Sequence, residues 1–167
     1  MSETVATEKK RKHKVAKHIT SIVIVVVVVF ATLQAIKLYR KQVCQFNIAI
    51  LGKSMLPYSV DNEGEYPDPE KWCDILLQFA LVTEKDFVCP SAGQGRCHYA
   101  MNPNCEPNSP SDMVLLFETK DGWNQFGGPE LLTFENHKGK GCNILFNDSH
   151  VEFVTPEQLG ELKWKNE

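Results

Sequence analysis

The sequence contains no aspartate, glutamate, lysine or arginine between Lys17 and Lys37, and no aspartate or glutamate between Glu8 and Asp61. The nineteen residues after Lys17, HITSIVIVVVVVFATLQAI, include a single ionisable side chain, His18, at their edge. As a helix they would extend roughly 28 Å, at about 1.5 Å per residue, which matches the hydrocarbon core of a bilayer. Five successive valines adopt a helix in lipid because each amide must find its partner within the segment. We therefore predict a transmembrane helix over residues 19–36, in contact with the lipid bilayer.

Basic residues are concentrated before this segment. Residues 1–18 contain six lysines and arginines against two glutamates, whereas three basic residues follow closely after it, at Lys37, Arg40 and Lys41. Positive charge marks the cytoplasmic side of a membrane helix. We expect a single-pass protein of the inner (cytoplasmic) membrane, with a basic cytoplasmic tail at 1–18, a signal anchor and an extracytoplasmic domain at 37–167. The alternative is a signal peptide that is cleaved near Ala35.

The basic tail is not expected to bind nucleic acid. Next to an apolar segment, lysines and arginines set the topology and contact anionic lipid.

All six cysteines lie on the side predicted to be exported. An even number in an exported domain of this size indicates up to three disulfides, with fifteen possible pairings. Zinc is the alternative, since three of the cysteines recur every eight residues and His98 is adjacent to one, but this spacing does not match the close pairs of structural zinc sites. The disulfide candidates are Cys44, Cys73, Cys89, Cys97, Cys105 and Cys142.

The chain also lacks the sequence motifs of common catalytic sites. It contains no HExxH, no nucleophile elbow and no complete phosphate-binding loop. We therefore expect a protein that is not an enzyme and that has no cofactor and no small-molecule substrate. The alternative is a metal-binding protein or metal-dependent enzyme that uses His137, Asp148 and His150, together with Glu118, if the two loops that contain the histidines meet at one end of the hairpin.

Local patterns predict an α+β domain with a small antiparallel sheet. Apolar residues spaced by three and four after the membrane segment predict that its helix continues to about Met55, where Leu56 and Pro57 end it. Asp68 and Pro69 are typical of a helix start and precede a short apolar helix through Phe79. MVLLFE at 113–118 is a buried strand, and Thr155 with Gln158 indicates the cap of a terminal helix. The continuing helix is expected to bury Ile36, Tyr39, Val43, Phe46 and Ile50.

The stretch from Cys142 to Phe153 predicts a hairpin with Asn147 and Asp148 in a two-residue turn. That register pairs Phe146 with Ser149 and places Cys142, Ile144, Phe146, Val151 and Phe153 on one face. Asn143, His150 and Glu152 would then lie on the outer face. A shift of one residue would destroy this segregation.

Several segments between residues 44 and 154 resemble the type II secretion pseudopilin-like proteins of planctomycete-type bacteria, whose ectodomains end in a histidine, nine residues and Asp-Gly. The resemblance implies a long N-terminal helix packed on a small antiparallel sheet and a role in protein contacts, since the family is not known as an enzyme family. The segments are CQFNIAILGKSMLPYSVDNEGEYP, WCDILL, FVCPS, MVLLFE, GWNQFGGPELLT and NHKGKGCNILFNDSHVEFV.

Two departures from this family matter. The first glycine of the chain is Gly52, so the prepilin processing site, a glycine before the membrane segment, is missing. Ten residues separate His137 from Asp148, and Ser149 stands where the family has glycine. We expect an envelope protein that acts through structural or protein–protein contacts with unknown envelope partners. The resemblance implies a relation to type II secretion, but without prepilin cleavage. The segment from Trp123 to Pro129 is a candidate contact surface, with core packing of Trp123 and Phe126 as the alternative.

Overall fold

The computed structural model describes residues 2–79 and 82–166, and the side chains of these residues apart from 2–12 and 15. It divides into two compact units, Met1–Tyr39 and Arg40–Glu167, which are described separately. Four antiparallel strands form one sheet in the order β1-β2-β3-β4, which confirms the α+β expectation. The elements are α1 (Ser2–Asp61), α2 (Trp72–Phe79), η1 (Glu84–Phe87), β1 (Tyr99–Met101), β2 (Val114–Glu118), η2 (Pro129–Leu131), η3 (Glu135–His137), β3 (Cys142–Phe146), β4 (Val151–Val154) and η4 (Pro156–Glu161).

The first unit contains the apolar part of α1. Its valines and isoleucines from residue 19 to residue 36 are exposed around the whole helix, as at Val26, which is 61% exposed, and Phe30, which is 63% exposed. The hydroxyl groups of Thr20 and Thr32 donate to carbonyl oxygens of their own helix, at Ala16 and Val29. In the described residues this is the one helix long enough and apolar enough to cross a membrane. Most of the predicted basic tail lies outside the side chains described.

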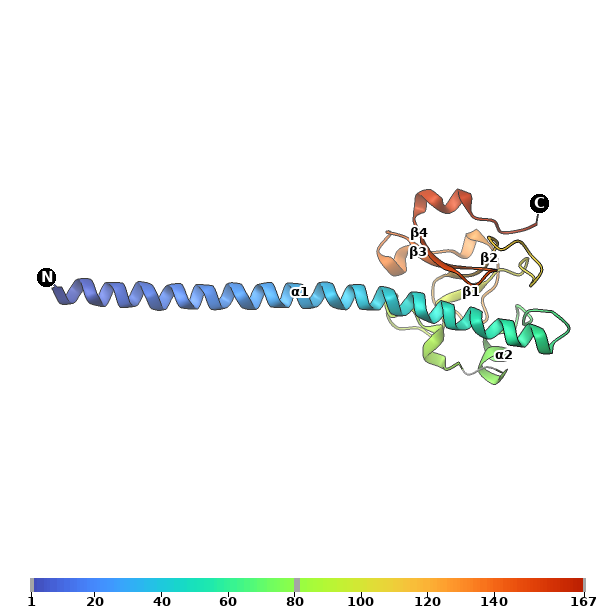
Figure 1. Cartoon of the computed structure of the whole chain (residues 1–167), viewed down its shortest axis with the longest axis horizontal. Coiled ribbons are helices and arrows are strands. Elements are labelled where there is room, and N and C mark those ends of the chain that lie inside the picture. The colour runs from blue at the N-terminus through green and yellow to red at the C-terminus, as the bar shows by residue number, and fades with distance from the viewer. Residues whose placement is uncertain (1, 80–81, 167) are drawn as a thin grey trace. The chain divides into compact units, whose positions relative to one another are not determined.

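In the second unit, α1 packs one face against the sheet (Figure 1). Cys44, Ile48, Leu51 and Met55 are fully buried, at steps of four, three and four residues. The predicted stripe was wrong at Tyr39 and Phe46, which are 67% and 64% exposed, whereas Ile50 packs against the buried cluster.

The close approach of helix and sheet depends on a glycine. A Cβ added at Gly52 would lie 2.1 Å from Cδ2 of Leu145, a buried residue of β3. A larger residue here would force the Leu145 side chain, or α1 itself, to move. The buried face of α1 is therefore the face that contains Gly52, Ile48 and Leu51.

The end of α1 also differs from the prediction. The helix continues past Pro57 to Asp61, and Gly64 closes it with a φ of +82° and an N–H that donates to the Ser59 carbonyl at 2.9 Å. Pro57 removes one hydrogen bond, to the carbonyl of Lys53, which is an exposed residue and accessible to water. The buried residues Met55 and Ser59 hold the last turns in place on either side of it.

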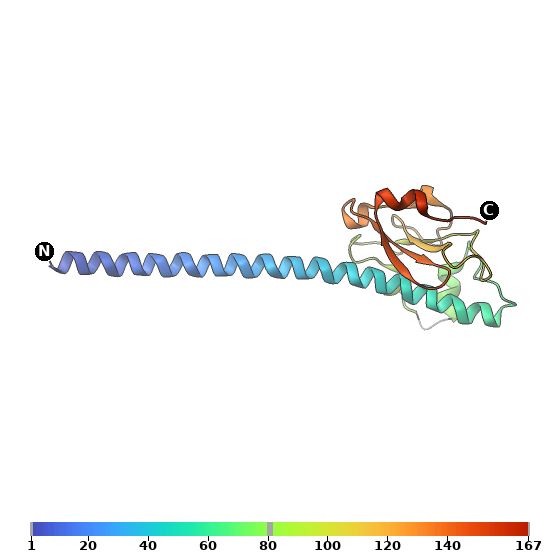
Figure 2. The same cartoon turned by 45° about the horizontal axis from the view of Figure 1, so that its top comes forward.

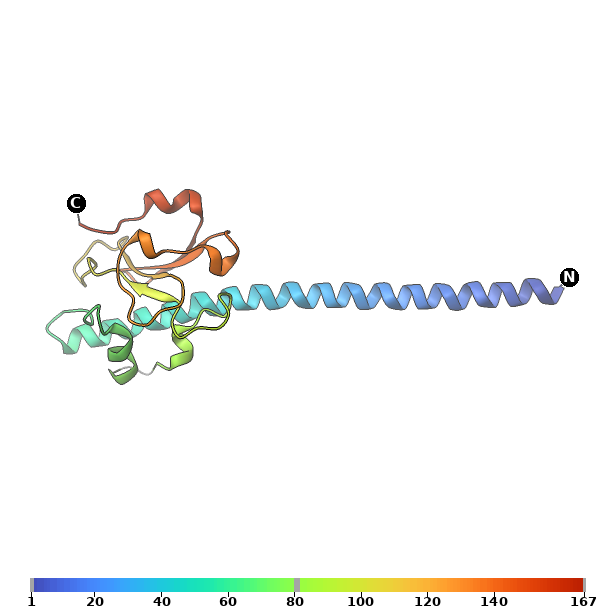
Figure 3. The same cartoon turned by 180° about the vertical axis from the view of Figure 1, so that it is seen from behind.

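The sheet is covered on both faces, as Figure 2 shows. On the α1 side, Tyr99, Met101, Leu116 and Leu145 join the larger apolar cluster, which also contains Trp72 and Leu76 of α2. The other face is covered by η2, η4 and the C-terminal segment (Figure 3). Its cluster contains Ala100, Val114, Phe117, Cys142, Ile144, Phe146 and Val154, with Leu131, Leu132, Phe134, Leu162 and Trp164 packed against them.

The β3–β4 hairpin is where predicted, but its register is shifted by one residue. The loop contains Asn147, Asp148 and Ser149, and Phe146 N–H donates to the carbonyl of His150 at 3.0 Å. Ser149 has a φ of 72°, so a three-residue loop with a left-handed residue replaces the tight turn. The predicted segregation was therefore wrong. Leu145 now pairs with Val151 and Asn143 with Phe153, on the face toward α1.

Other local predictions were confirmed. β2 begins one residue inside the predicted strand and is entirely buried. Thr155 and Gln158 form the expected capping box, although the turns they start are 3₁₀ rather than α-helical. Asp68 caps a turn through Glu70 N–H at 3.0 Å, and α2 begins after it, at Trp72. The short strand β1 was not predicted, because it lies within a segment rich in proline, asparagine and glycine.

Candidate functional site

The three residues of the predicted metal site do not come together. His137 ends η3 and is 9% exposed, whereas Asp148 and His150 pair with each other in the exposed hairpin loop. The five residues of β3 separate the two places, which corresponds to roughly 15 Å at about 3.3 Å per residue. The expectation of a site formed by His137, Asp148 and His150 was wrong because these loops lie at opposite ends of the hairpin.

One disulfide is present among the described cysteines. It joins Cys44 of α1 to Cys89, which follows η1, with Cα atoms 4.6 Å apart. The Cys73 thiol donates to the sulfur of Cys97 at 3.9 Å; the two are not joined by a disulfide, and both residues are buried. Cys105 and Cys142 are buried in different parts of the domain. Burial raises the pKa of the Cys73, Cys105 and Cys142 thiols, so these thiols stay protonated at neutral pH.

The alternative zinc site at Cys89, Cys97 and Cys105 is not formed. Cys89 is in the disulfide, Cys97 faces Cys73, and Cys105 contacts the side-chain oxygen of Asn147 at 3.4 Å. His98 uses its Nδ1 to accept the N–H of Cys89 at 3.3 Å. The regular spacing of the three cysteines therefore does not bring their sulfur atoms together.

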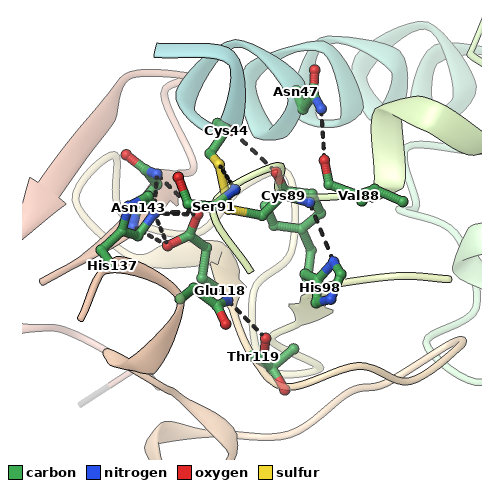
Figure 4. Close-up of a disulfide and its surroundings, with 12 residues drawn as sticks. Cys44, Asn47, Val88, Cys89, Ser91, His98, Glu118, Thr119, His137 and Asn143 are labelled. Carbon is green, nitrogen blue, oxygen red and sulfur yellow. Dashed lines mark hydrogen bonds and ion pairs between the residues drawn. A yellow bond between two sulfur atoms is a disulfide. The ribbon is translucent and has the colours of Figure 1, made fainter. Parts of the chain in front are cut away.

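A buried polar cluster lies beside the disulfide (Figure 4). We call it the Glu118 cluster, and it consists of Glu118, His137 and Asn143. Nε2 of His137 lies 3.0 Å and 2.9 Å from the two carboxylate oxygens of Glu118. Asn143 donates its backbone N–H to Glu118 at 3.0 Å and its side-chain N–H at 2.9 Å. The Glu118 carboxylate is thus held by donors from β3 and η3.

Three local features bring these side chains together. Glu118 is the last residue of β2, and β2 pairs with β3, which places the Asn143 N–H beside its carboxylate. Lys138 has a φ of 60° and ends η3, so the chain reverses directly after His137. The His137 ring then packs edge-on against Phe153, with ring centroids 5.2 Å apart.

The Glu118 carboxylate is fully buried, and its negative charge affects neighbouring groups. Removing a carboxylate from water is costly unless hydrogen bonds compensate, and here His137 and Asn143 supply them. Burial raises the pKa of the Tyr99 hydroxyl and of the Cys142 thiol, and the charge of Glu118 raises both further. Asn143 Oδ1 is buried without a hydrogen-bond partner among the described residues.

The disulfide and the Glu118 cluster form one group of potential ligands. Nε2 of His137 lies 3.8 Å from Sγ of Cys89. The sulfur atoms of Cys44 and Cys89, a carboxylate oxygen of Glu118 and a ring nitrogen of His137 all lie within 4.8 Å of one another. In the described residues this is the one group of three or more such side chains close enough to hold a metal ion.

The sequence indicated only part of this group. Glu118 and His137 were both named in the alternative metal site, together with Asp148 and His150. Asn143 was placed on the outer face, and it is instead fully buried. The contribution of Cys44 and Cys89 was not foreseen, because their positions relative to Glu118 depend on how α1 packs on the sheet.

The predicted contact segment Trp123–Pro129 is divided between two roles. Trp123 packs on Phe87, with centroids 5.1 Å apart, and donates to Asp74 at 2.8 Å. The side-chain hydrogen bonds from Asn124 and then Trp123 lower the pKa of Asp74. Phe126 is 41% exposed. Core packing is thus confirmed for Trp123 and not for Phe126.

A surface hollow of about 610 Å³ is separate from the Glu118 cluster. It lies over η2 and η3, and Lys120 and Glu135 form an ion pair of 3.3 Å at its edge. Its lining contains Thr119, Lys120, Gln125, Glu130, Leu131, Leu132, Thr133, Phe134, Glu135 and Gly139. None of the four potential metal ligands lines it.

No protein-family model, curated protein or solved structure matches this chain. The resemblance to pseudopilin-like proteins therefore stays a prediction that comes from the sequence segments alone.

Proposed function

We propose that this chain is a single-pass membrane protein of the cell envelope, whose domain acts through protein contacts in the manner of a pseudopilin-like subunit. Residues 19–36 would span the inner membrane, the basic tail would be cytoplasmic, and residues 37–167 would be extracytoplasmic. The observation that carries the proposal is the apolar segment of α1, in which side chains are exposed around the whole circumference. Such a surface is costly in water and suits lipid.

The proposed orientation rests on charge and on cysteine chemistry. Six basic residues precede the segment and three follow it closely. The Cys44–Cys89 disulfide suits an oxidising compartment, which lies outside the cytoplasm.

The proposed contact role rests on apolar residues that α1 leaves uncovered within the domain. Phe46 is 64% exposed, Leu56 42% and Val60 81%, and Phe79 of α2 is 57% exposed beside Tyr58. Phe46, Leu56 and Val60 belong to the helix that also contains the apolar segment. A helix of this kind suits lateral contacts between membrane-anchored subunits or with another envelope protein.

The topology is tested by adding protease to intact spheroplasts that contain the full chain with an epitope tag at each end. The C-terminal tag should be lost and the N-terminal tag protected until the membrane is opened. The reverse pattern, or recovery of the chain in the cytosol with reduced cysteines, would contradict the proposal. N-terminal sequencing of the same material decides between an anchor and cleavage near Ala35.

The contact role is tested by placing a photo-crosslinking amino acid at Phe46, and separately at Glu157 as a control. Glu157 is an exposed residue of η4 on the other side of the sheet. Discrete adducts at Phe46 that are absent at Glu157 are expected, and adducts of the chain with itself would indicate a polymer. Equal labelling at the two positions would argue against a contact surface on α1.

A further inference from the structure

We infer that the Cys44–Cys89 position is a redox-dependent metal site, which binds a thiophilic divalent ion such as Zn²⁺ when the disulfide is reduced. The ligands would be the thiolates of Cys44 and Cys89, Nε2 of His137 and the carboxylate of Glu118. This inference goes beyond the proposed envelope function and does not depend on it. The membrane topology only decides which form, disulfide or metal, is present.

The geometry of the four side chains supports this set. They come from α1, the segment after η1, β2 and η3, and their ligand atoms converge on one point (Figure 4). Zinc bonds of about 2.0–2.3 Å in a tetrahedron place neighbouring ligand atoms about 3.3–3.8 Å apart. The His137 Nε2 to Cys89 Sγ distance is already 3.8 Å, and His137 Nε2 to Glu118 is 2.9 Å. Small side-chain rotations would be enough to admit the ion.

The types of ligand also suit zinc. Thiolate and imidazole are preferred by Zn²⁺ over the hard cations, and a carboxylate completes a four-coordinate site. All four residues are buried, with His137 the most exposed at 9%. A closed set of four protein ligands is typical of a structural site, because no position stays open for substrate.

Groups around the ligands resemble the outer shell of a metal site. Asn143 fixes the Glu118 carboxylate through two hydrogen bonds, and the N–H of Ser91 points to Sγ of Cys44 at 3.5 Å. Outer hydrogen bonds of this kind orient metal ligands. The unpaired buried oxygen of Asn143 is a second indication, since such atoms are found where a water or ion completes a site.

The chemical step requires a dithiol reductant. One thiolate of the reductant attacks the Cys89 sulfur, forms a mixed disulfide and releases Cys44 as a thiol. The second thiol of the reductant then releases Cys89 and closes the reductant's own disulfide, so two electrons and two protons reach the protein. On binding, Zn²⁺ displaces both thiol protons, which pass to solvent, and Nε2 of His137 binds the ion as the neutral imidazole that has its proton on Nδ1. In either form the site joins α1 to the sheet.

The test uses the full chain in detergent micelles, reduced with a dithiol, freed of reductant and titrated with Co²⁺ in the absence of oxygen. We expect one Co²⁺ per chain, with a thiolate-to-cobalt charge-transfer band and the visible bands of tetrahedral cobalt. Zn²⁺ should displace the cobalt, and the oxidised chain should show no band. Absence of these bands in the reduced native chain would overturn the inference whatever the variants do.

Variants then assign the ligands. The double variant C73S/C97S removes the other close pair of sulfur atoms and should keep the band at one Co²⁺ per chain. C44S/C89S should lose it, and Glu118→Gln and His137→Gln should each weaken binding at least tenfold while part of the thiolate band remains. A band that survives in C44S/C89S and disappears in C73S/C97S would place the metal elsewhere and contradict the inference.

Discussion

Two parts of helix α1 differ in which of their side chains are buried. From residue 19 to residue 36 the helix is apolar on every side and all of its side chains are exposed, whereas from Cys44 to Met55 only one face is buried. A helix that packs on a protein needs one apolar stripe, and a helix in lipid needs apolar side chains all around. The comparison shows that one helix has two kinds of surface along its length, one suited to a protein core and one suited to lipid.

The largest effect is expected in the apolar part. Replacing Val26 and Val28 together by arginine should prevent membrane insertion, because each arginine near the centre of a membrane helix costs about 2.5–3.5 kcal/mol. The variant should move to the soluble or aggregated fraction after alkaline extraction of membranes. Val26→Leu with Val28→Leu is the matched control and should stay in the membrane. If the arginine variant stays there too, the segment does not lie in lipid.

The next effect concerns the covalent link between α1 and the rest of the domain. The Cys44–Cys89 disulfide spans 45 residues of sequence, so its loss should lower the free energy of unfolding by about 4 kcal/mol. Urea unfolding of the full chain, oxidised and then reduced with a chelator present, measures the difference. The variant C73S/C97S should show the same dependence on reduction. If reduction no longer lowers the free energy of unfolding in C73S/C97S, the stabilising disulfide joins Cys73 and Cys97 and not Cys44 and Cys89.

A smaller effect separates the two faces of the packed part of α1. Leu51 is fully buried and Leu56 is 42% exposed on the same helix. Leu51→Ala should cost roughly 3 kcal/mol through lost burial and a cavity, and Leu56→Ala less than about 1 kcal/mol. Midpoints of urea unfolding give both values. Equal costs would show that the face assigned to the core is not the one that packs.

The smallest expected effect is a loss of the domain's unfolding free energy at alkaline pH. Burial, and then the charge of Cys105, raises the pKa of Tyr66 to about 12, and burial with Glu106 raises that of Cys105 to about 12. Both groups approach the same side-chain oxygen of Asn147. A raised folded pKa contributes stability that is present below the unfolded pKa, here 10.0 for tyrosine and 9.0 for cysteine. That stability is lost as the pH rises toward about 12.

Tyr66→Phe removes one of the two titrating groups and should make the loss of stability above about pH 10 less steep. Urea midpoints across this range measure the slope. Residues 19–36 of α1 contain no titrating side chain. The helical circular dichroism of this part in micelles should therefore stay constant over the pH range in which the domain loses stability. An unchanged slope in the variant would exclude Tyr66 as a source of the alkaline effect.

Local patterns predicted the parts of the fold that depend on neighbouring residues. The capping box of Thr155 and Gln158 and the strand after Met113 were found because their signals lie within a few residues. The buried face of α1 was wrong, since apolar residues at three and four spacings occur on two faces and the sequence contains no signal that selects one. The hairpin register was wrong because Ser149 adopts a left-handed conformation that its sequence does not require.

The candidate site, too, was predicted only where local sequence was enough. Glu118 and His137 were recognised as candidates by residue type, and their contact at 2.9 Å depends on where η3 lies relative to the end of β2. Asn143 was missed because a strand covered on both faces has no outer side, and Cys44 and Cys89 were missed because their positions depend on how α1 packs on the sheet. Their convergence depends on contacts over tens of residues, such as the 45 between Cys44 and Cys89.

The sequence by itself determined the apolar segment, its basic flank and the α+β composition, because these depend on which residues are adjacent along the chain. Only the tertiary structure decided which cysteines pair, which face of α1 is buried and that Glu118, His137 and Asn143 meet beside a disulfide. The physical reason is that side-chain packing selects among registers and helix faces whose local energies are nearly equal.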